Sequence, residues 1–379
     1  MPKDQRAPRI FLFINVDWFA ESHFIRFIVE LSKKSELFLL SQDTGRLHIF
    51  RDYCNVIDLP SGRSSNSLER EIRSLLRVLK HMILHRPDIV EVVSIKSIII
   101  WGLISRLLCI PRRVSYFTGL GSVISQERSM LSLTIYHILR LAIGGSNSYI
   151  IAENQKNLEF ALERSLVNPK KCILLNGVGV DLEVFRPFGT YSYGVDTKSL
   201  TVGMASRLLR DKGVYEYIEA CSIIEELMPG SYRYSLAGST DEHNPTSLTK
   251  LELKALLSMH PYIRYEGHID KMNKYLASLS LFVLPSYHEG YPKVLIEASA
   301  CGIPVIATDI PGCRDIVEMC RNGLLVAPKN GEKLAEAMLL ILTDDTMRST
   351  FGKNSRKYAL ANYDAEKVAK QHVKFVLGS

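Results

Sequence analysis

The chain has 379 residues, of which 46% are hydrophobic and 23% charged, an ordinary composition for a globular protein of two domains. Its seven cysteines are scattered without a Cys-x-x-Cys pair, which argues against a zinc site or a redox pair and indicates a reducing, cytoplasmic compartment. No apolar run reaches the ~20 residues that a membrane-spanning helix needs, and the polar start lacks a signal-peptide pattern. We therefore expect neither a membrane-spanning helix nor a signal peptide.

The formal net charge is +7, and the excess of basic residues lies in the first 180 positions. Two interpretations stay open: these residues only solvate helix faces, or they approach anionic lipid headgroups or a pyrophosphate-linked lipid. Nucleic acid is not expected as a partner, because the chain has no recognition motif and no basic stripe interleaved with aromatics. The basic residues concerned are Arg63, Arg70, Arg73, Arg77, Lys80, Arg86, Arg106, Arg112 and Arg113.

Short apolar runs alternate with amphipathic stretches over the first half of the chain. Continuous apolar runs of strand length indicate strands buried on both faces, and helical spacing of apolar residues indicates the helices between them. The predicted strands are 10–14, 37–40, 89–93, 114–117 and 149–152, and the predicted helices are 19–31, 68–84, 96–108 and 131–141.

The segment 176–193 is rich in glycine, proline and turn residues, and we place the domain boundary there, with domains at 1–180 and 181–361. A second alternation of strands and helices follows. Its predicted strands are 202–205, 232–237, 263–265, 281–284, 305–307 and 324–326, and its predicted helices are 213–227, 247–258, one starting near Pro292, 333–343, 345–361 and 365–377.

This alternation predicts an α/β protein with two doubly wound, Rossmann-like domains that face each other across a cleft. Ligands in such folds bind at the carboxyl ends of the parallel strands. Residues that follow the predicted strands are therefore the candidates for function.

The most informative stretch is Ser286 to Ala298, which follows the strand 281–284. It places Glu289 in a tight loop and Glu297 about two turns into the next helix. Both carboxylates are then placed to accept hydrogen bonds from vicinal hydroxyls of a sugar or a ribose, and the first turn of the helix can hold a phosphate. The alternative is that both are ordinary solvated carboxylates.

A second stretch, Gly203 to Gly213, also lies between a strand and a helix. Arg207 and Lys212 are five residues apart in this loop, so that both can converge on one anion such as a departing diphosphate. The alternative is an ordinary basic turn.

Together these stretches resemble the motifs of the family 4 retaining glycosyltransferases. The resemblance rests on the E-x7-E pair with its Glu-Gly-Tyr-Pro core, on the following Cys301 to Thr308 and Pro311-Gly312, and on the Gly-x3-Arg-x4-Lys-Gly loop of Gly203 to Gly213. It is strongest over 200–330 and looser over 1–170, where it points to a bacterial subgroup that builds surface polysaccharides. It implies the fold called GT-B, with the last residues, 362–379, returning to the first domain.

The resemblance assigns roles to these residues. Arg207 and Lys212 form the diphosphate clamp, Glu297 accepts from the ribose hydroxyls, and Glu289 binds the donor sugar. The backbone of Gly290, Tyr291 and Pro292 approaches that sugar and its phosphate, and His268 lies after a strand where the family contacts the nucleotide base, most often uridine.

Two loops of the first domain resemble the same subgroup. His23, in Phe19-Ala20-Glu21-Ser22-His23, is a candidate for the acceptor side, although Phe24 replaces the arginine of the subgroup and a buried structural histidine is the alternative. Thr118 and Gly119, in Thr118-Gly119-Leu120-Gly121, are candidates near the reacting sugar or the acceptor, and a plain turn is the alternative.

We therefore expect a metal-independent hexosyltransferase that moves a hexose or N-acetylhexosamine from a UDP-sugar. No cofactor is expected, and no Asp-x-Asp metal motif is evident. The expected acceptor is a lipid-linked glycan or a growing polysaccharide of a bacterial envelope, with peripheral contact to the inner face of the cytoplasmic membrane. A nucleotide-sugar epimerase of the same fold and a non-catalytic nucleotide-sugar-binding assembly protein remain alternatives.

Overall fold

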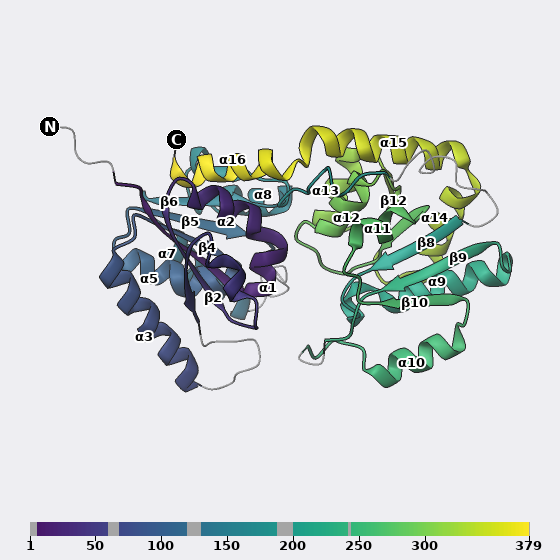
Figure 1. Cartoon of the computed structure of the whole chain (residues 1–379), viewed down its shortest axis with the longest axis horizontal. Helices are drawn as coiled ribbons and strands as arrows, with labels where there is room; N and C mark the ends of the chain where they lie inside the picture. Colours follow the sequence, from purple (N-terminus) through teal and green to yellow (C-terminus); the bar gives the residue numbers. More distant parts are fainter. Residues whose placement is uncertain (1–5, 60–67, 120–129, 188–199, 242–243, 379) are drawn as a thin grey trace. The chain divides into compact units, whose positions relative to one another are not determined.

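The computed structural model describes residues 6–59, 68–119, 130–187, 200–241 and 244–378. The chain forms two compact units, of which unit 1 comprises Met1–Val178 with Glu366–Ser379 and unit 2 comprises Gly179–Ala365. Each unit is built around one parallel sheet with helices on both faces (Figure 1). The predicted pair of doubly wound α/β sheets is confirmed.

The sheet of unit 1 has seven parallel strands in the order β3-β2-β1-β4-β5-β6-β7. These are β1 (Arg9–Val16), β2 (Glu36–Gln42), β3 (Asn55–Asp58), β4 (Ile89–Val93), β5 (Arg112–Phe117), β6 (Ser148–Ala152) and β7 (Cys172–Leu174). The longer helices are α2 (Ile25–Ser32), α3 (Leu68–His85), α7 (Met130–Ile143), α8 (Gln155–Glu163) and α16 (Ala365–Leu377), and the short ones are α1 (Asp17–Phe19), α4 (Ile95–Ser97), α5 (Leu103–Leu107) and the 3-10 turns Leu47–Phe50 and Pro169–Lys171.

Strand β1 shows why this sheet is buried on both faces. Ile10, Leu12 and Ile14 enter one apolar cluster, whereas Phe11 and Phe13 enter another on the opposite face. Helix α16 covers the first of these faces, and four of its side chains lie in that cluster: Val368, Ala369, Val373 and Val376.

Two helices that the sequence predicts as continuous contain a π-helical segment instead, at Ala20–Phe24 and at Ile98–Gly102. The widened turn admits one extra residue, a distortion that is often found at functional sites. The first of these segments carries His23.

The sheet of unit 2 has six parallel strands in the order β10-β9-β8-β11-β12-β13. These are β8 (Leu200–Ala205), β9 (Tyr232–Ala237), β10 (Ile263–Gly267), β11 (Leu281–Leu284), β12 (Val305–Thr308) and β13 (Gly323–Val326). The helices are α9 (Val214–Leu227), α10 (Lys250–Met259), α11 (Met272–Ala277), α12 (Lys293–Ala300), α13 (Pro311–Cys320), α14 (Gly331–Thr343), α15 (Asp345–Asn362) and the 3-10 turn Arg210–Lys212.

The strand order of unit 2 reverses between β8 and β11. Helix α9, which follows β8, packs into one apolar cluster, and α12, which follows β11, packs into the cluster on the other face. The chain therefore leaves β8 and β11 toward helices on opposite faces of the sheet, and the carboxyl edge between two such strands is the position where doubly wound sheets bind ligands.

No helix in the described ranges is both long and apolar enough to cross a membrane.

Candidate functional site

Two loops meet at the carboxyl edge of the unit 2 sheet, one after β8 and the other after β11. The N–H of Tyr287 donates to the carbonyl of Asp211 over 2.8 Å. Gly213 has φ +75°, and a Cβ atom there would lie 2.2 Å from the carbonyl oxygen of Pro285. Only glycine fits this conformation and this close approach, so the residue fixes how the first loop lies on the second.

This contact places Lys212 beside Glu289. The Nζ atom of Lys212 lies 2.7 Å from Oε1 of Glu289, and the two side chains are only 16% and 15% exposed. The structure thus brings together one residue from each of the two motifs found in the sequence, although 77 positions separate them.

Arg207 lies on the same loop as Lys212 and pairs with a residue that the sequence does not single out. Its Nη1 atom is 3.3 Å from Oδ2 of Asp241, which follows the neighbouring strand β9. Both side chains are partly exposed, so this ion pair is weak and can yield to a stronger anion. Asp241 can be recognised as a partner of Arg207 only because β8 and β9 end next to each other, and this requires knowledge of the strand order.

Glu297 lies on α12 and is buried, with a relative exposure of 7%. Burial raises the pKa of its carboxyl group, and the ammonium group of Lys293 acts in the opposite direction. The Nζ atom of Lys293 lies 3.2 Å from Oε1, one helical turn earlier. Glu297 is therefore a largely desolvated acceptor with one cationic neighbour, the kind of group whose hydrogen bonds to hydroxyls are strong.

The Gly290-Tyr291-Pro292 segment leads directly into α12, and Pro292 is its N-cap residue. The side chain of Tyr291 is buried, and its hydroxyl oxygen lies 2.9 Å from that of Tyr363. The carbonyl of Gly290 lies so close to Gly312 that a Cβ atom there would be 1.8 Å away. The conformation of this segment is thus determined by Tyr363 and by the first turn of α13.

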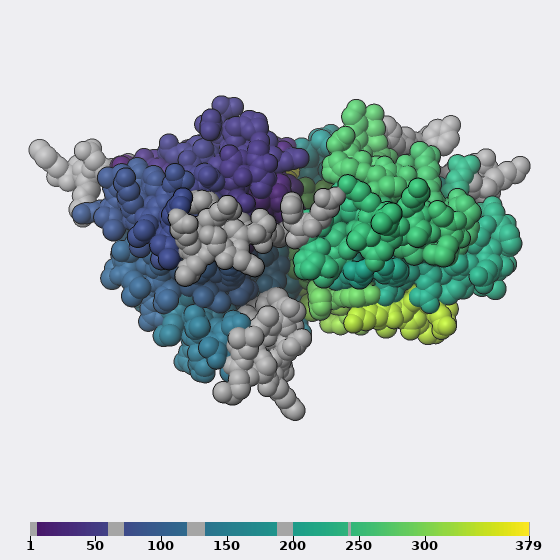
Figure 2. Space-filling view, turned by 90° about the horizontal axis from the view of Figure 1, so that it is seen from below, coloured from purple at the N-terminus to yellow at the C-terminus, as the bar shows by residue number. Residues whose placement is uncertain are grey.

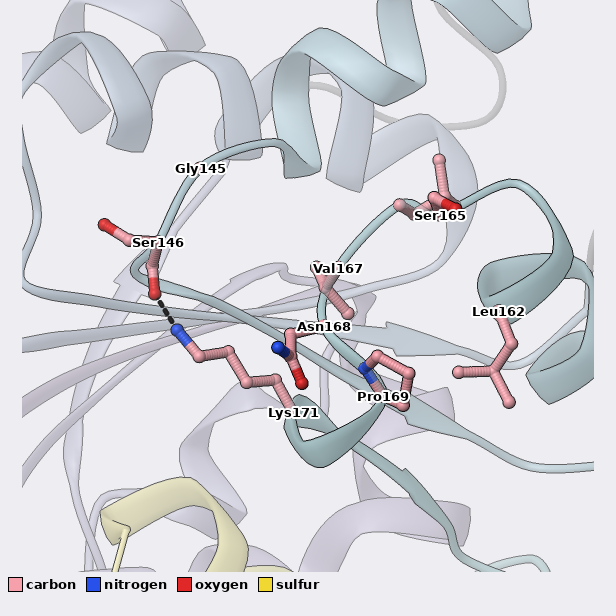
Figure 3. Close-up of a pocket in the computed structure, with 9 residues that line it drawn as sticks. Gly145, Ser146, Leu162, Ser165, Val167, Asn168, Pro169 and Lys171 are labelled. Carbon is pink, nitrogen blue, oxygen red and sulfur yellow. Dashed lines mark hydrogen bonds between the residues drawn. The ribbon is translucent and has the colours of Figure 1, made fainter.

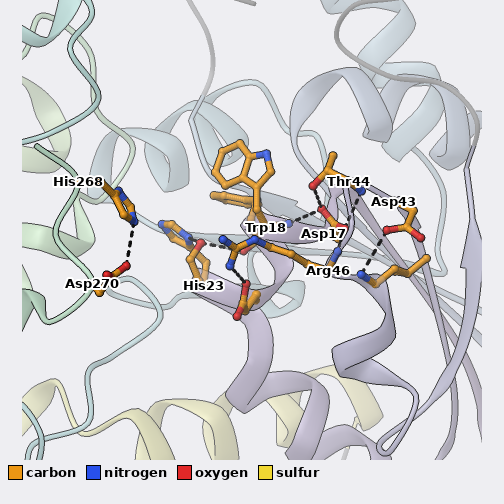
Figure 4. A network of polar contacts seen from close by, with 12 residues as sticks. Asp17, Trp18, His23, Asp43, Thr44, Arg46, His268 and Asp270 are labelled. Atoms are coloured by element: carbon orange, nitrogen blue, oxygen red, sulfur yellow. Dashed lines mark hydrogen bonds and ion pairs between the residues drawn. The ribbon is translucent and has the colours of Figure 1, made fainter. Parts of the chain in front are cut away.

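His268 follows β10 at the same edge of the sheet but lies apart from these groups. Its side chain is exposed, and its Nε2 atom is 3.6 Å from Oδ1 of Asp270, whose side chain is exposed as well (Figure 4). In the part of the chain that the structure describes, no hydrogen bond or ion pair joins it to Lys212 or Glu289.

The candidate residues of unit 1 also follow strands of their sheet. His23 is half-buried, its Nδ1 atom lies 2.7 Å from the hydroxyl oxygen of Ser22, and its ring stacks on Phe19 at 4.3 Å between centroids. Thr118 and Gly119 come directly after β5 and are half-buried. The remainder of that predicted loop, Leu120 and Gly121, lies outside the described residues.

A buried aspartate that the sequence does not predict organises the carboxyl edge of unit 1. The carboxylate of Asp17 accepts hydrogen bonds from the backbone N–H groups of Trp18, Thr44 and Arg46 at 2.7, 2.7 and 2.8 Å (Figure 4). Burial acts to raise the pKa of Asp17, but these bonds and one from the Thr44 hydroxyl lower it overall. An ionised Asp17 therefore fastens the loop after β2 to the loop after β1.

A cavity of about 450 Å³ opens elsewhere in unit 1, between residues 145–146 and the segment 162–171 (Figure 3). Lys171 closes one side of it by donating to the carbonyl of Ser146. None of the predicted site residues lines this cavity.

In the described ranges, no three His, Cys, Asp or Glu side chains come together as a possible metal site. Arg207, Lys212 and Lys293 are three of the positively charged side chains at this edge of unit 2.

Comparison with known families gives two matches that together span most of the chain. Residues 191–358 match the model of the glycosyl transferases group 1, and residues 9–154 match that of the glycosyl transferase 4-like family.

Curated bacterial relatives cover most of the chain. The N,N'-diacetylbacillosaminyl-diphospho-undecaprenol alpha-1,3-N-acetylgalactosaminyltransferase of Campylobacter jejuni is 29% identical over 312 residues, which are 79% of this chain and 78% of the relative. The UDP-Gal:alpha-D-GlcNAc-diphosphoundecaprenol alpha-1,3-galactosyltransferase of Escherichia coli is 23% identical over 345 residues, 89% and 87% of the two chains.

Among solved structures, HepE of Anabaena in complex with UDP superposes with a TM-score of 0.79 at 18% identity, covering 98% of this chain and 100% of that one. WaaG, a glycosyltransferase involved in lipopolysaccharide biosynthesis, superposes with a TM-score of 0.71 at 16% identity, covering 98% and 100%. These similarities identify the fold as that of known glycosyltransferases.

Proposed function

Since the chain belongs to the group 1 glycosyl transferases, we propose that it moves a hexose or N-acetylhexosamine from a UDP-sugar to a lipid-linked diphosphate acceptor, with retention of the anomeric configuration. The names of the Campylobacter and Escherichia relatives include an undecaprenol-linked diphosphate, which supports this class of acceptor. The UDP in the HepE complex supports the choice of base.

The observation that carries the proposal is the pairing of Lys212 with Glu289 at the edge of the unit 2 sheet, with Arg207 on the same loop. Negative charge grows on the diphosphate oxygens as the sugar departs. Cations already held in place lower the barrier, because they need no reorganisation at the moment of reaction. Lys212 and Arg207 are assigned this role.

The acidic residues orient the hydroxyl-bearing parts of the donor. Glu289 accepts from hydroxyls of the sugar while it still holds Lys212 near the diphosphate. Glu297, which is buried, accepts from the ribose. The segment 289–292, called the donor loop below, presents its backbone to the sugar and phosphate, and His268 is assigned to the nucleotide side.

The proposed step is a displacement on one face of the sugar. The bond between the anomeric carbon and the phosphate oxygen breaks, and its electron pair stays on the departing UDP. The acceptor oxygen bonds to the anomeric carbon from the same side, and its proton passes to the departing phosphate oxygen. No protein base is needed, and we propose that no metal ion is needed because fixed cations supply the positive charge.

The donor is tested by measuring the unfolding temperature with a panel of UDP-, GDP-, ADP- and dTDP-sugars, because a ligand stabilises the folded state that binds it. Transfer is then followed from the best donor to an undecaprenyl-diphosphate-linked sugar, with and without excess EDTA. We expect stabilisation by a UDP-sugar and transfer that EDTA leaves unchanged. Turnover of the donor without acceptor and without hydrolysis would indicate an epimerase instead.

Arg207→Ala is the sharpest variant for the clamp, and Arg210→Ala is its matched control. Arg210 lies on the same loop but pairs with Glu252, away from Lys212. Loss of one fixed cation slows the transfer step by roughly ten- to thousandfold. Equal rates for the two variants would contradict the assignment of Arg207.

We also propose that α3 docks the protein on an anionic membrane. This helix exposes an apolar stripe of Ile72, Leu76 and Ile83, which are 46%, 60% and 61% exposed. Arg73 and Lys80 lie on the same helix. Apolar side chains flanked by basic ones are typical of helices that lie in the headgroup region. The blue surface of unit 1 in Figure 2 includes this part of the chain.

Leu76→Glu tests this docking, and Leu251→Glu on α10 is its control because Leu251 is 81% exposed in unit 2. We expect sedimentation with vesicles that contain anionic phospholipid, reduced by the first substitution and not by the second. Equal sedimentation of both variants, or none of the wild type, would contradict docking through α3.

A further inference from the structure

A buried chain of polar side chains leads from the donor loop to the point where the polypeptide leaves unit 2. The hydroxyl oxygens of Tyr291 and Tyr363 are 2.9 Å apart, and the Sγ atom of Cys320 lies 3.6 Å from the Tyr363 hydroxyl. Tyr291 is 6% exposed and Tyr363 is fully buried. Neither hydroxyl can turn to water, so the loss of this bond would leave a buried polar group unsatisfied.

Tyr363 lies next to both segments that join unit 2 to unit 1. The N–H of Val180 donates to the carbonyl of Tyr363 over 2.8 Å, and the N–H of Ala365 donates to the carbonyl of Val180 over 3.1 Å. Gly179 has φ +70°, and a Cβ atom there would lie 2.7 Å from Cα of Ala365. Residues 179–181 and 363–365 therefore run side by side as one paired linker.

The other end of α12 is tied to the segment that follows this linker. The guanidinium of Arg356 donates to the carbonyls of Ala300, at the end of α12, and of Phe185, at 2.7 and 2.9 Å. Helix α12, which carries Glu297, is thus connected to the linker region at its beginning through Tyr291 and at its end through Arg356. A shift of the helix cannot leave the linker region unchanged unless one of these bonds breaks.

We propose that the hydrogen bond between Tyr291 and Tyr363 couples occupation of the donor loop to the paired linker, and that Tyr363 is a positioning residue for the donor. This inference rests on the proposed function, because it takes the donor loop to be the place where the diphosphate of UDP binds. Binding that moves the backbone of Tyr291 moves its hydroxyl, and the buried hydroxyl of Tyr363 follows it. The carbonyl of Tyr363 then carries the change to the N–H of Val180.

The test uses UDP as the ligand and compares Tyr363→Phe with Tyr358→Phe. The ring of Tyr358 packs edge-on against Tyr363, with the centroids 5.4 Å apart, so the control removes a neighbouring hydroxyl and leaves the bond to Tyr291 intact. UDP affinity is measured by calorimetry, and amide hydrogen exchange is followed at Val180 and Ala365 with and without saturating UDP.

We expect UDP to change exchange at these two amides in the wild type and in Tyr358→Phe. Tyr363→Phe should bind UDP about 2- to 10-fold more weakly, the effect of one buried hydrogen bond, and show no such change at saturation. Tyr291→Phe removes the other hydroxyl of the same bond and should also weaken UDP binding and abolish the exchange response. It replaces Tyr363→Phe in the test if that variant folds poorly.

An unchanged response at the linker in Tyr363→Phe, or none in a wild type that binds UDP, would overturn the coupling and leave the proposed donor intact. A wild type that does not bind UDP would remove the donor assignment, and the coupling with it.

Discussion

The ion pair between Lys212 and Glu289 can be tested by a double-mutant cycle. Lys212→Met removes the charge and keeps much of the side-chain volume, and Glu289→Gln keeps the shape of the acid. Two unit charges 2.7 Å apart attract each other by about 1.5 kcal/mol at a dielectric constant of 80 and by about 6 kcal/mol at 20. Because both side chains are about one-sixth exposed, we expect a coupling energy between these limits.

Each single variant should be less stable than the double variant, because it leaves one charge largely buried without its partner. Amide exchange in strands β11 and β12 reports the free energy of opening of unit 2, since core strands exchange through its most complete unfolding. The four proteins of the cycle are compared at one pH. Additive effects, with a coupling energy below about 0.5 kcal/mol, would refute the pairing.

The same variants separate binding from chemistry. Lys212→Met should lower the rate of transfer by roughly a hundred- to thousandfold, because a cation that faces the growing charge is lost. Glu289→Gln should weaken use of the donor sugar while UDP itself still binds. If Lys212→Met transferred sugar at the wild-type rate, the proposed clamp would be wrong.

Three further changes have defined outcomes. Gly213→Ala should lower the unfolding free energy of unit 2, measured by amide exchange, by at least about 2 kcal/mol. Gly230 also has a positive φ but has open space around it, so Gly230→Ala should show only the smaller cost of the backbone conformation. Burial raises the pKa of Glu153 from 4.5 to about 8, so the folded state binds more protons between these pH values and stability falls as the pH rises through them. Glu153→Gln should remove this pH dependence of stability. The unfolding free energy of the variant minus that of the wild type should therefore rise by up to about 1.4 kcal/mol per pH unit in that window and become constant above it. The guanidinium of Arg112 donates to the carbonyls of residues 375 and 376 at the end of α16. Arg112→Met removes these bonds, and we expect faster amide exchange at that end of the helix and not elsewhere.

The strands and helices with strong apolar patterns could be predicted from the sequence, and the ones that were missed have physical reasons. Strands β4 and β11 have the predicted bounds because each is a continuous buried run, and β9 also has them although only its last four residues are buried. Strands β3 and β7 were missed because they are short and lie at the two edges of their sheet, where burial is incomplete. Helix α13 was missed because Pro311-Gly312 is typical of a turn, although proline suits the first position of a helix.

The site residues could be predicted only where they belong to a recognisable motif. Arg207, Lys212, Glu289 and Glu297 were singled out in this way. Asp241 and Tyr363 lie far from these motifs along the chain, and their relevance depends on strand order and on packing across an apolar cluster. Sequence spacing carries no information about either.

The position of α16 has a consequence for how the protein is made. This helix supplies one wall of the unit 1 core, and His372 within it forms a fully buried pair with Glu91 of β4, with 2.6 Å between Nε2 and Oε1. Unit 2 has all its strands and helices in the nascent chain before residue 365 is translated, whereas unit 1, although synthesised first, keeps an open apolar face until residues beyond 376 leave the ribosome. The first half of the polypeptide is thus the last to mature, and a premature stop codon near the 3′ end of the message damages the amino-terminal half of the product.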